Sequence, residues 1–170
     1  MSTSDGGNTG SGGTLVDSDT VAITVTPVND APTATDKTIT VLEDGSHTFT
    51  AADFGFSDSQ DNPANTLVAI IITTLPGSGA LTLNGVAVTQ DQVIAVADIG
   101  QMLFTPAANA NGNSYASIGF KVQDNGGTDN SGADTSESAN TLTFNVTSVN
   151  DAPTLDSSLS RTLVTASQND

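Results

Sequence analysis

Side chains with oxygen donors recur at two separate places in the chain. The hexamer Val-Asn-Asp-Ala-Pro-Thr occupies residues 28–33 and returns unchanged at residues 149–154. In each copy the Asn and the Asp offer amide and carboxylate oxygens and tolerate turn geometry, while the Pro stiffens the backbone after them. Oxygens of this kind, placed in loops, are the ligands that Ca²⁺ prefers. The hexamer therefore predicts a short, stiff junction with oxygen donors, and the alternative is a rigid spacer that binds nothing.

The acidic residues of the chain are almost all aspartates. The 170 residues carry 19 acidic and three basic side chains, a formal net charge of −16, and only Glu43 and Glu137 among the acids are not Asp. Asp favours turns and calcium-binding loops, whereas a surface that is merely solubilising would use Glu as freely. The charge excludes electrostatic binding to nucleic acid and to anionic membranes, and it favours a divalent cation as the neutralising partner. Several of these acids must nevertheless be ordinary solvated loop residues.

The two hexamers also define the organisation of the chain. They begin at residues 28 and 149, which are 121 residues apart, and a long identical segment at a fixed offset indicates tandem repeats. We expect residues 1–28 to be the tail of one repeat, 29–149 a whole repeat, and 150–170 a linker with the start of the next. Residues 1–13 are rich in Gly, Ser, Thr and Asn and are expected to be flexible, as is the C-terminal tail. Residues 20–28 alternate like a strand, but one without partners.

Short strands separated by turn signals are predicted throughout the repeat. The apolar run 67–75 is typical of a strand inside a packed sheet, and Asn84-Gly85 between two short apolar runs predicts a tight hairpin. Residues 97–100 are predicted to form one helical turn. Further strands are expected at 38–42, 48–52, 93–96, 102–104, 115–122 and 142–149. Roughly seven to nine strands in a repeat of this length predict an all-β, antiparallel two-sheet sandwich.

Other functions are disfavoured by residues that the sequence lacks. There is no Cys, which excludes disulfides, zinc–thiolate clusters and thiol catalysis. The single histidine, His47, lies in a strand pattern, and no nucleophile-elbow sequence is present, so the chain is not expected to be an enzyme. No apolar run is long enough to cross a bilayer, so membrane insertion is not expected, and no signal peptide is visible.

Residues 29–153 resemble the cadherin-like domains that occur in tandem in large secreted bacterial adhesins and RTX-type surface proteins. The resemblance rests on the two Val-Asn-Asp-Ala-Pro linkers and on the run Phe-Lys-Val-Gln-Asp at 120–124, ahead of the last strand. It implies a Greek-key sandwich of the cadherin or immunoglobulin type, an extracellular location at the bacterial surface or in the medium, and a role in cell adhesion. The implied partners are neighbouring repeats and a host or cell-surface protein or glycan, with the chain itself a monomer.

Carried over residue by residue, the resemblance assigns Ca²⁺ ligands to two junctions. The upstream set is Asn29, Asp30, Asp58, Asp61 and Asp124, and the downstream set is Glu43, Asn150 and Asp151. The chain also departs from the pattern of the family. Asp58 and Asp61 are separated by two residues instead of one, and residues 105–108 stand where animal cadherins carry an acidic motif. Fewer acids imply fewer ions or weaker binding.

Two alternatives to a calcium-stiffened extender repeat remain open. The repeat could itself recognise a carbohydrate or a partner protein through the polar loops at 53–65 or 124–139, or it could be a spacer without calcium. A sugar-binding surface usually needs exposed aromatic rings. The chain has Tyr115 as its single Tyr and no Trp, so we favour the extender over the recognition module.

Overall fold

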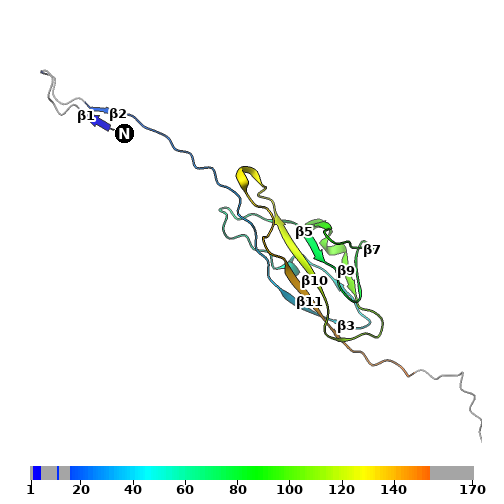
Figure 1. Cartoon of the computed structure of the whole chain (residues 1–170). Coiled ribbons are helices and arrows are strands. Elements are labelled where there is room, and N and C mark those ends of the chain that lie inside the picture. Colours follow the sequence, from blue (N-terminus) through cyan, green and yellow to red (C-terminus); the bar gives the residue numbers. More distant parts are fainter. Residues whose placement is uncertain (1, 5–10, 12–15, 154–170) are drawn as a thin grey trace, which may run out of the picture.

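Two β-sheets pack face to face around one apolar core (Figure 1). The computed structural model describes residues 2–4, 11 and 16–153. The first sheet contains β3 (Lys37–Leu42), β11 (Asn140–Thr147), β10 (Gly112–Asp124), β5 (Leu67–Thr74) and β8 (Val93–Ala95), in that order. The second contains β4 (His47–Thr48), β9 (Met102–Thr105), β6 (Ala80–Leu83) and β7 (Val86–Ala87). The predicted all-β sandwich is therefore confirmed.

The core follows from the alternation of side chains along the long strands. In β10, Ile118, Phe120 and Val122 are fully buried and alternate with residues that are more exposed, as the period of two in the sequence predicts. The apolar run at 67–75 forms β5, which lies between β10 and β8 and is flanked on both sides, as predicted. The rings of Phe104 in the second sheet and Phe144 in the first stack with their centroids 3.9 Å apart, which joins the two sheets directly.

The predicted hairpin and helical turn are both present. Asn84 and Gly85 connect β6 to β7 with φ values of 52° and 78°, the left-handed geometry that a two-residue hairpin turn requires. Residues Val96–Gln101 form the 3₁₀ helix η2, which includes the predicted turn at 97–100. A third short helix, η3 (Asp129–Ser131), lies in the polar loop that follows β10.

Two predictions about strands are wrong. The segment 48–52 is not a strand beyond Thr48, because the Asp53 carboxylate accepts hydrogen bonds from the backbone N–H and the hydroxyl of Thr50 and turns the chain into the 3₁₀ helix η1 (Ala51–Phe54). The sandwich is also not purely antiparallel. Strands β3 and β11 run parallel, whereas all other strand pairs in the described part of the chain are antiparallel.

The chain enters and leaves the sandwich at opposite ends (Figure 1). We call the end where residues 27–30 enter the upstream pole, and the end where residues 148–151 leave the downstream pole. The predicted strand at 20–28 pairs with no strand among the described residues. Ahead of it, β1 (Ser2–Ser4) and β2 (Val16–Ser18) pair with each other in an antiparallel arrangement. The flexibility expected for residues 1–13 and for the tail after Pro153 concerns mostly residues outside the described ranges. None of the helices described is long and apolar enough to span a bilayer.

Candidate metal site at the upstream pole

The linker at the upstream pole is held between two loops. On one side, Thr33 and Ser57 exchange backbone hydrogen bonds of 2.7 and 2.9 Å. On the other side, the Asn29 carbonyl accepts a hydrogen bond from the Ala133 N–H at 2.9 Å, and the Asn29 side-chain amide donates to the Ala133 carbonyl at 2.6 Å. The linker hexamer is therefore fixed against both polar loops, 53–65 and 124–139, and brings its Asn and Asp between them.

Asp124 forms one side of the candidate site. It is the last residue of β10 and is only 2% exposed. Its Oδ1 accepts hydrogen bonds from the Gly126 N–H at 2.8 Å and from the Asn29 side-chain amide at 3.1 Å. Its Oδ2 is buried and has no hydrogen-bond partner. A buried carboxylate oxygen without a donor or a cation is energetically unfavourable.

Asp58 presents a second buried oxygen of the same kind. The residue follows the Thr33–Ser57 contact and is 7% exposed. Its Oδ2 accepts a hydrogen bond from the Asn65 N–H at 2.6 Å, whereas its Oδ1 has no partner. Two aspartates at one pole thus each keep one oxygen buried and unsatisfied, which is the arrangement that a bound cation would relieve.

The electrostatics of the site favour a positive charge beside Asp124. Burial raises the pKa of Asp124, and the negative charges of Asp58 and Asp134 raise it further. The hydrogen bonds from Gly126 and Asn29 lower the pKa but do not compensate for these effects. The folded state therefore holds a proton on Asp124 more tightly than the unfolded state does, and a cation would satisfy the same demand at neutral pH.

Asp30, Asp61 and Asn65 surround the same pole. The Asp61 Oδ2 accepts hydrogen bonds from the Asp30 N–H at 3.0 Å and from the Asn65 side-chain amide at 3.2 Å. The Asn65 amide also donates to the Asn29 side-chain oxygen. A hollow of about 200 Å³ opens beside Asn29, Asp61 and Asn65. All five residues of the predicted upstream set therefore lie at one pole, in contact with one another or with the loops that hold them.

Two residues of this pole did not emerge from the sequence. Asn65 links the Asp58 loop to Asn29 through its hydrogen bonds. In the sequence, only its amide side chain, near the end of a polar loop, could have indicated this role. Gly126 has no side chain, and a Cβ there would collide with the side-chain oxygen of Asn29. A Gly-Gly pair is typical of a turn, but by itself it does not indicate that another segment packs against it.

The downstream residues are not brought together in the same way. Glu43 is 4% exposed, and its two oxygens accept hydrogen bonds from the Val149 N–H at 2.7 Å and from the Asn111 amide at 2.9 Å. These bonds lower the pKa of Glu43. Asn150 and Asp151 are exposed, and within the described residues no hydrogen bond joins either of them to Glu43. The downstream set therefore has one satisfied carboxylate and two separate exposed side chains.

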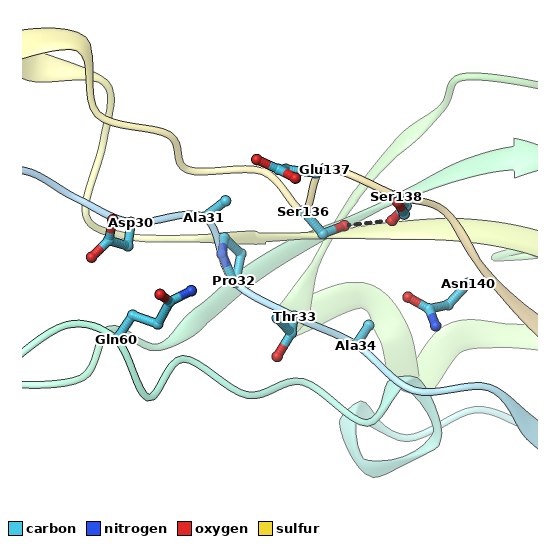
Figure 2. A pocket seen from close by; sticks show the side chains of 10 residues that line it. All are labelled: Asp30, Ala31, Pro32, Thr33, Ala34, Gln60, Ser136, Glu137, Ser138 and Asn140. Atoms are coloured by element: carbon cyan, nitrogen blue, oxygen red, sulfur yellow. Dashed lines mark hydrogen bonds between the residues drawn. The ribbon is translucent and has the colours of Figure 1, made fainter.

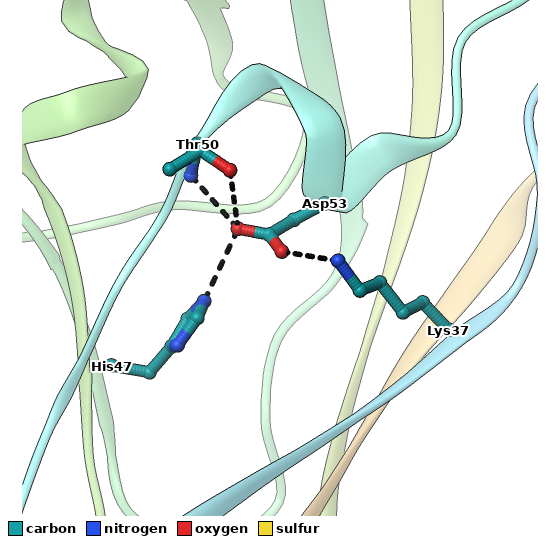
Figure 3. Close-up of polar contacts among 4 residues, drawn as sticks. All are labelled: Lys37, His47, Thr50 and Asp53. Carbon is teal, nitrogen blue, oxygen red and sulfur yellow. Dashed lines mark hydrogen bonds and ion pairs between the residues drawn. The ribbon is translucent and has the colours of Figure 1, made fainter.

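A separate polar cluster lies around Asp53, where β3, β4 and η1 meet (Figure 3). One Asp53 oxygen contacts the Lys37 ammonium at 2.6 Å, and the other contacts the His47 ring at 3.2 Å. Burial alone would raise the pKa of Asp53, but the hydrogen bonds from Lys37, Thr50 and His47 together lower it. His47 also packs edge-on against Phe49, with ring centroids 5.0 Å apart. The single histidine thus supports the junction of β4 and η1.

Replacing Asp53 with Asn is expected to lower the free energy of unfolding at neutral pH by about 1.5–3 kcal/mol, because charge-assisted hydrogen bonds are lost. Since the pKa of Asp53 is lowered, its contribution is present above the ordinary value of 3.8 and is lost as the pH falls through the folded-state pKa. Urea unfolding near pH 7 and near pH 3 should show the variant and the wild type converging in acid. The exposed Asp44→Asn variant is the control, and an equal effect at both pH values would contradict the prediction.

The candidate site has to be judged by its geometry alone. No protein-family model matches the chain, and no curated protein or solved structure matches it either. Within the described residues, no three His, Cys, Asp or Glu side chains lie close enough to form a metal site by themselves. A cation at the upstream pole would therefore use the two aspartate oxygens together with amide or carbonyl oxygens, a donor set that suits Ca²⁺ and not Zn²⁺.

Proposed function

We propose that this chain carries a cadherin-like extender repeat of a bacterial surface or secreted adhesin, possessing a Ca²⁺ site at the junction with the preceding repeat. In this proposal the sandwich is of the Greek-key, cadherin or immunoglobulin-like type, and the repeat lengthens and stiffens a rod outside the cell. The opposite positions at which the chain enters and leaves the sandwich support such a rod (Figure 1). The parallel pairing of the first and last sandwich strands, β3 and β11, supports the assignment of the fold type.

One observation carries the calcium site. Asp58 Oδ1 and Asp124 Oδ2 are both buried and both without a partner, at the pole where the linker is held. Ca²⁺ takes six to eight oxygen ligands, so amide and carbonyl oxygens of the linker and its loops, such as the side-chain oxygen of Asn29, would complete the set. Asp61 supports the same loops by accepting hydrogen bonds from the Asp30 N–H and the Asn65 amide. When bound, the cation would neutralise the two buried carboxylates and tie the linker to both loops. The junction would then be stiffer with calcium than without it.

Thermal unfolding in EGTA, in magnesium and in calcium tests this proposal directly. With a cation concentration of about 5–10 mM, roughly tenfold above the dissociation constant of a weak extracellular site, calcium should add about 1–1.5 kcal/mol per site. For a domain of this size that corresponds to a rise in Tm of about 3–6 °C. Magnesium should have little effect, because it demands a tighter octahedral site.

The matched control keeps the change of charge and moves its position. The double variant Asp58→Asn, Asp61→Asn should lose the calcium response, whereas the double variant Asp44→Asn, Asp91→Asn, at two exposed turn residues, should keep it. A wild-type Tm that is the same in calcium and in EGTA would argue against the calcium site and leave a plain spacer.

A groove in the same region favours one second candidate, a recognition module. A hollow of about 530 Å³ lies beside the linker residues 30–34, between the polar loops at 53–65 and 124–139. Figure 2 shows Asp30 and Gln60 toward one end of this groove and Asn140 toward the other. Amides, hydroxyls and carboxylates line it and could bind sugar hydroxyls or a peptide. A ligand whose binding is lost in Gln60→Ala and Asn140→Ala, with the calcium response unchanged, would favour this candidate.

A further inference from the structure

Residues 14–33 align without gaps to residues 135–154, well beyond the shared hexamer. Ten of the twenty positions carry the same residue in both segments. Outside the hexamer, the identical residues of the first segment are Thr14, Thr20, Val25 and Thr26. The second segment contains β11, the strand that closes the sandwich between β3 and β10. The alignment therefore pairs residues 20–26 with a strand whose surroundings are known.

The inward face of β11 has an apolar counterpart in residues 20–26. Leu142, Phe144 and Val146 point into the core and are 0%, 0% and 3% exposed. The residues aligned with them are Val21, Ile23 and Val25, which are 75%, 84% and 84% exposed. The residues between them are Ala22 and Thr24, so the small or polar outward face is retained as well. Side chains of this type normally form one side of a core.

The sandwich of the same chain cannot cover this face. The slot for a closing strand between β3 and β10 is filled by β11, which pairs with β3 over the six residue pairs from Lys37–Leu142 to Leu42–Thr147. A second copy of the chain has the same slot filled in the same way. The larger Leu142 and Phe144 also bury more apolar surface there than Val21 and Ile23 would. Residues 20–26 therefore require a sandwich whose slot is open.

We propose that residues 20–26 are the closing strand of a second β-sandwich of this same type, one that has no closing strand of its own. The segment would lie parallel to that domain's equivalent of β3 and antiparallel to its equivalent of β10, with Val21, Ile23 and Val25 in the core. The inference rests on the tandem arrangement of the proposed function, but not on calcium. Its consequence is that the upstream domain ends at Val28, one residue before the candidate ligand Asn29, so its folding fixes where the linker starts.

An extended chain tests the proposal. A second copy of residues 29–134 is fused directly to the N-terminal side of Thr14. Residues 14–28 then follow this added copy at the positions that residues 135–149 would occupy, in the same register. In EGTA, the backbone amides of residues 20–26 should become protected from hydrogen exchange by on the order of 100-fold or more relative to the unextended chain. In the matched control, the added copy keeps its own residues 135–149. In the control, residues 142–148 of the added copy should be protected. If they are protected there while residues 20–26 are not protected in the extended chain, the proposal is overturned.

A triple variant provides the second test. Replacing Val21, Ile23 and Val25 with Ser should abolish the new protection in the extended chain, because the core face is lost. The same triple variant in the unextended chain should leave the Tm unchanged, because these side chains are exposed there. A lower Tm in the unextended variant would mean that the segment packs on its own sandwich, and it would overturn the proposal. Both measurements are made without calcium, so they do not depend on whether the metal site exists.

Discussion

Replacing Asp124 with Asn is expected to stabilise the sandwich in EGTA and to destabilise it, relative to wild type, in calcium. Without a cation, the wild type keeps a buried carboxylate oxygen with no partner near the charge of Asp58. An amide in its place removes the repulsion and can donate toward Asp58, which should add about 1 kcal/mol to the free energy of unfolding. With calcium, the variant lacks a charged ligand and should lose the response of about 1–1.5 kcal/mol.

The effect of pH on this variant has a definite sign. Because the pKa of Asp124 is raised, the folded state binds the proton more tightly than the unfolded state, whose pKa lies near the ordinary value of 3.8. The stability that this proton contributes is fully present below that value and is lost as the pH rises through the folded-state pKa. In EGTA the advantage of the variant over wild type should therefore shrink as the pH is lowered toward 3.8. Thermal melts across this range, with Asp91→Asn as the charge control, measure it. A variant that is less stable than wild type in both buffers would contradict the assignment.

Replacing Phe144 with Ala is expected to cost about 3–5 kcal/mol of stability, a large share of the roughly 5–15 kcal/mol that is typical of a folded domain. Phe144 is fully buried, and its ring stacks on Phe104 at 3.9 Å and meets Phe49 edge-on at 6.1 Å. Truncation removes the contact that joins the two sheets and leaves a cavity in the middle of the core. Urea unfolding at neutral pH, followed by far-UV circular dichroism, measures the loss.

The chain itself supplies the control for this substitution. Residue 23, which aligns with Phe144, is Ile, so Phe144→Ile places the side chain of the aligned segment at the same position. It keeps most of the apolar volume and should cost only about 1–2 kcal/mol. An equal loss in the Ala and the Ile variants would show that the stacked rings, and not the filled volume, determine the stability.

The fold could be predicted wherever the determining signal is local in the sequence. The run 67–75 is uninterruptedly apolar, so it predicts a strand with a neighbouring strand on each side. The dipeptide Asn84-Gly85 favours a tight hairpin turn by itself. The direction of pairing between β3 and β11 could not be predicted, because period-2 alternation is the same for parallel and antiparallel neighbours. The turn at Asp53 is an exception, because its signal is local: Thr50 and Asp53, three residues apart, form the capping box that begins η1, yet the segment was predicted to be a strand.

The candidate site shows the same division. The hexamer and the excess of Asp indicated oxygen donors at the junction, and the fold places Asn29, Asp58 and Asp124 at one pole. The unpaired oxygens themselves could not be predicted, because they depend on how deeply the loops bury each carboxylate. At the other pole the sequence pattern was equally clear, yet the oxygens of Glu43 are already occupied by Val149 and Asn111. The spacing of residue types in the sequence therefore predicts which end of the domain carries oxygen donors. How the loops pack decides which of these oxygens remain available to a cation.

The parallel pairing of β3 and β11 has a mechanical consequence. These are the first and last strands of the sandwich, and the chain leaves them toward opposite ends of the domain (Figure 1). A pull on the two ends therefore acts along the strands and shears them past each other, so the force is shared by the hydrogen bonds along all six residue pairs of the ladder at once. In an antiparallel pair with both free ends on one side, the same pull would open one bond at a time. The domain is thus built to resist tension along its long axis.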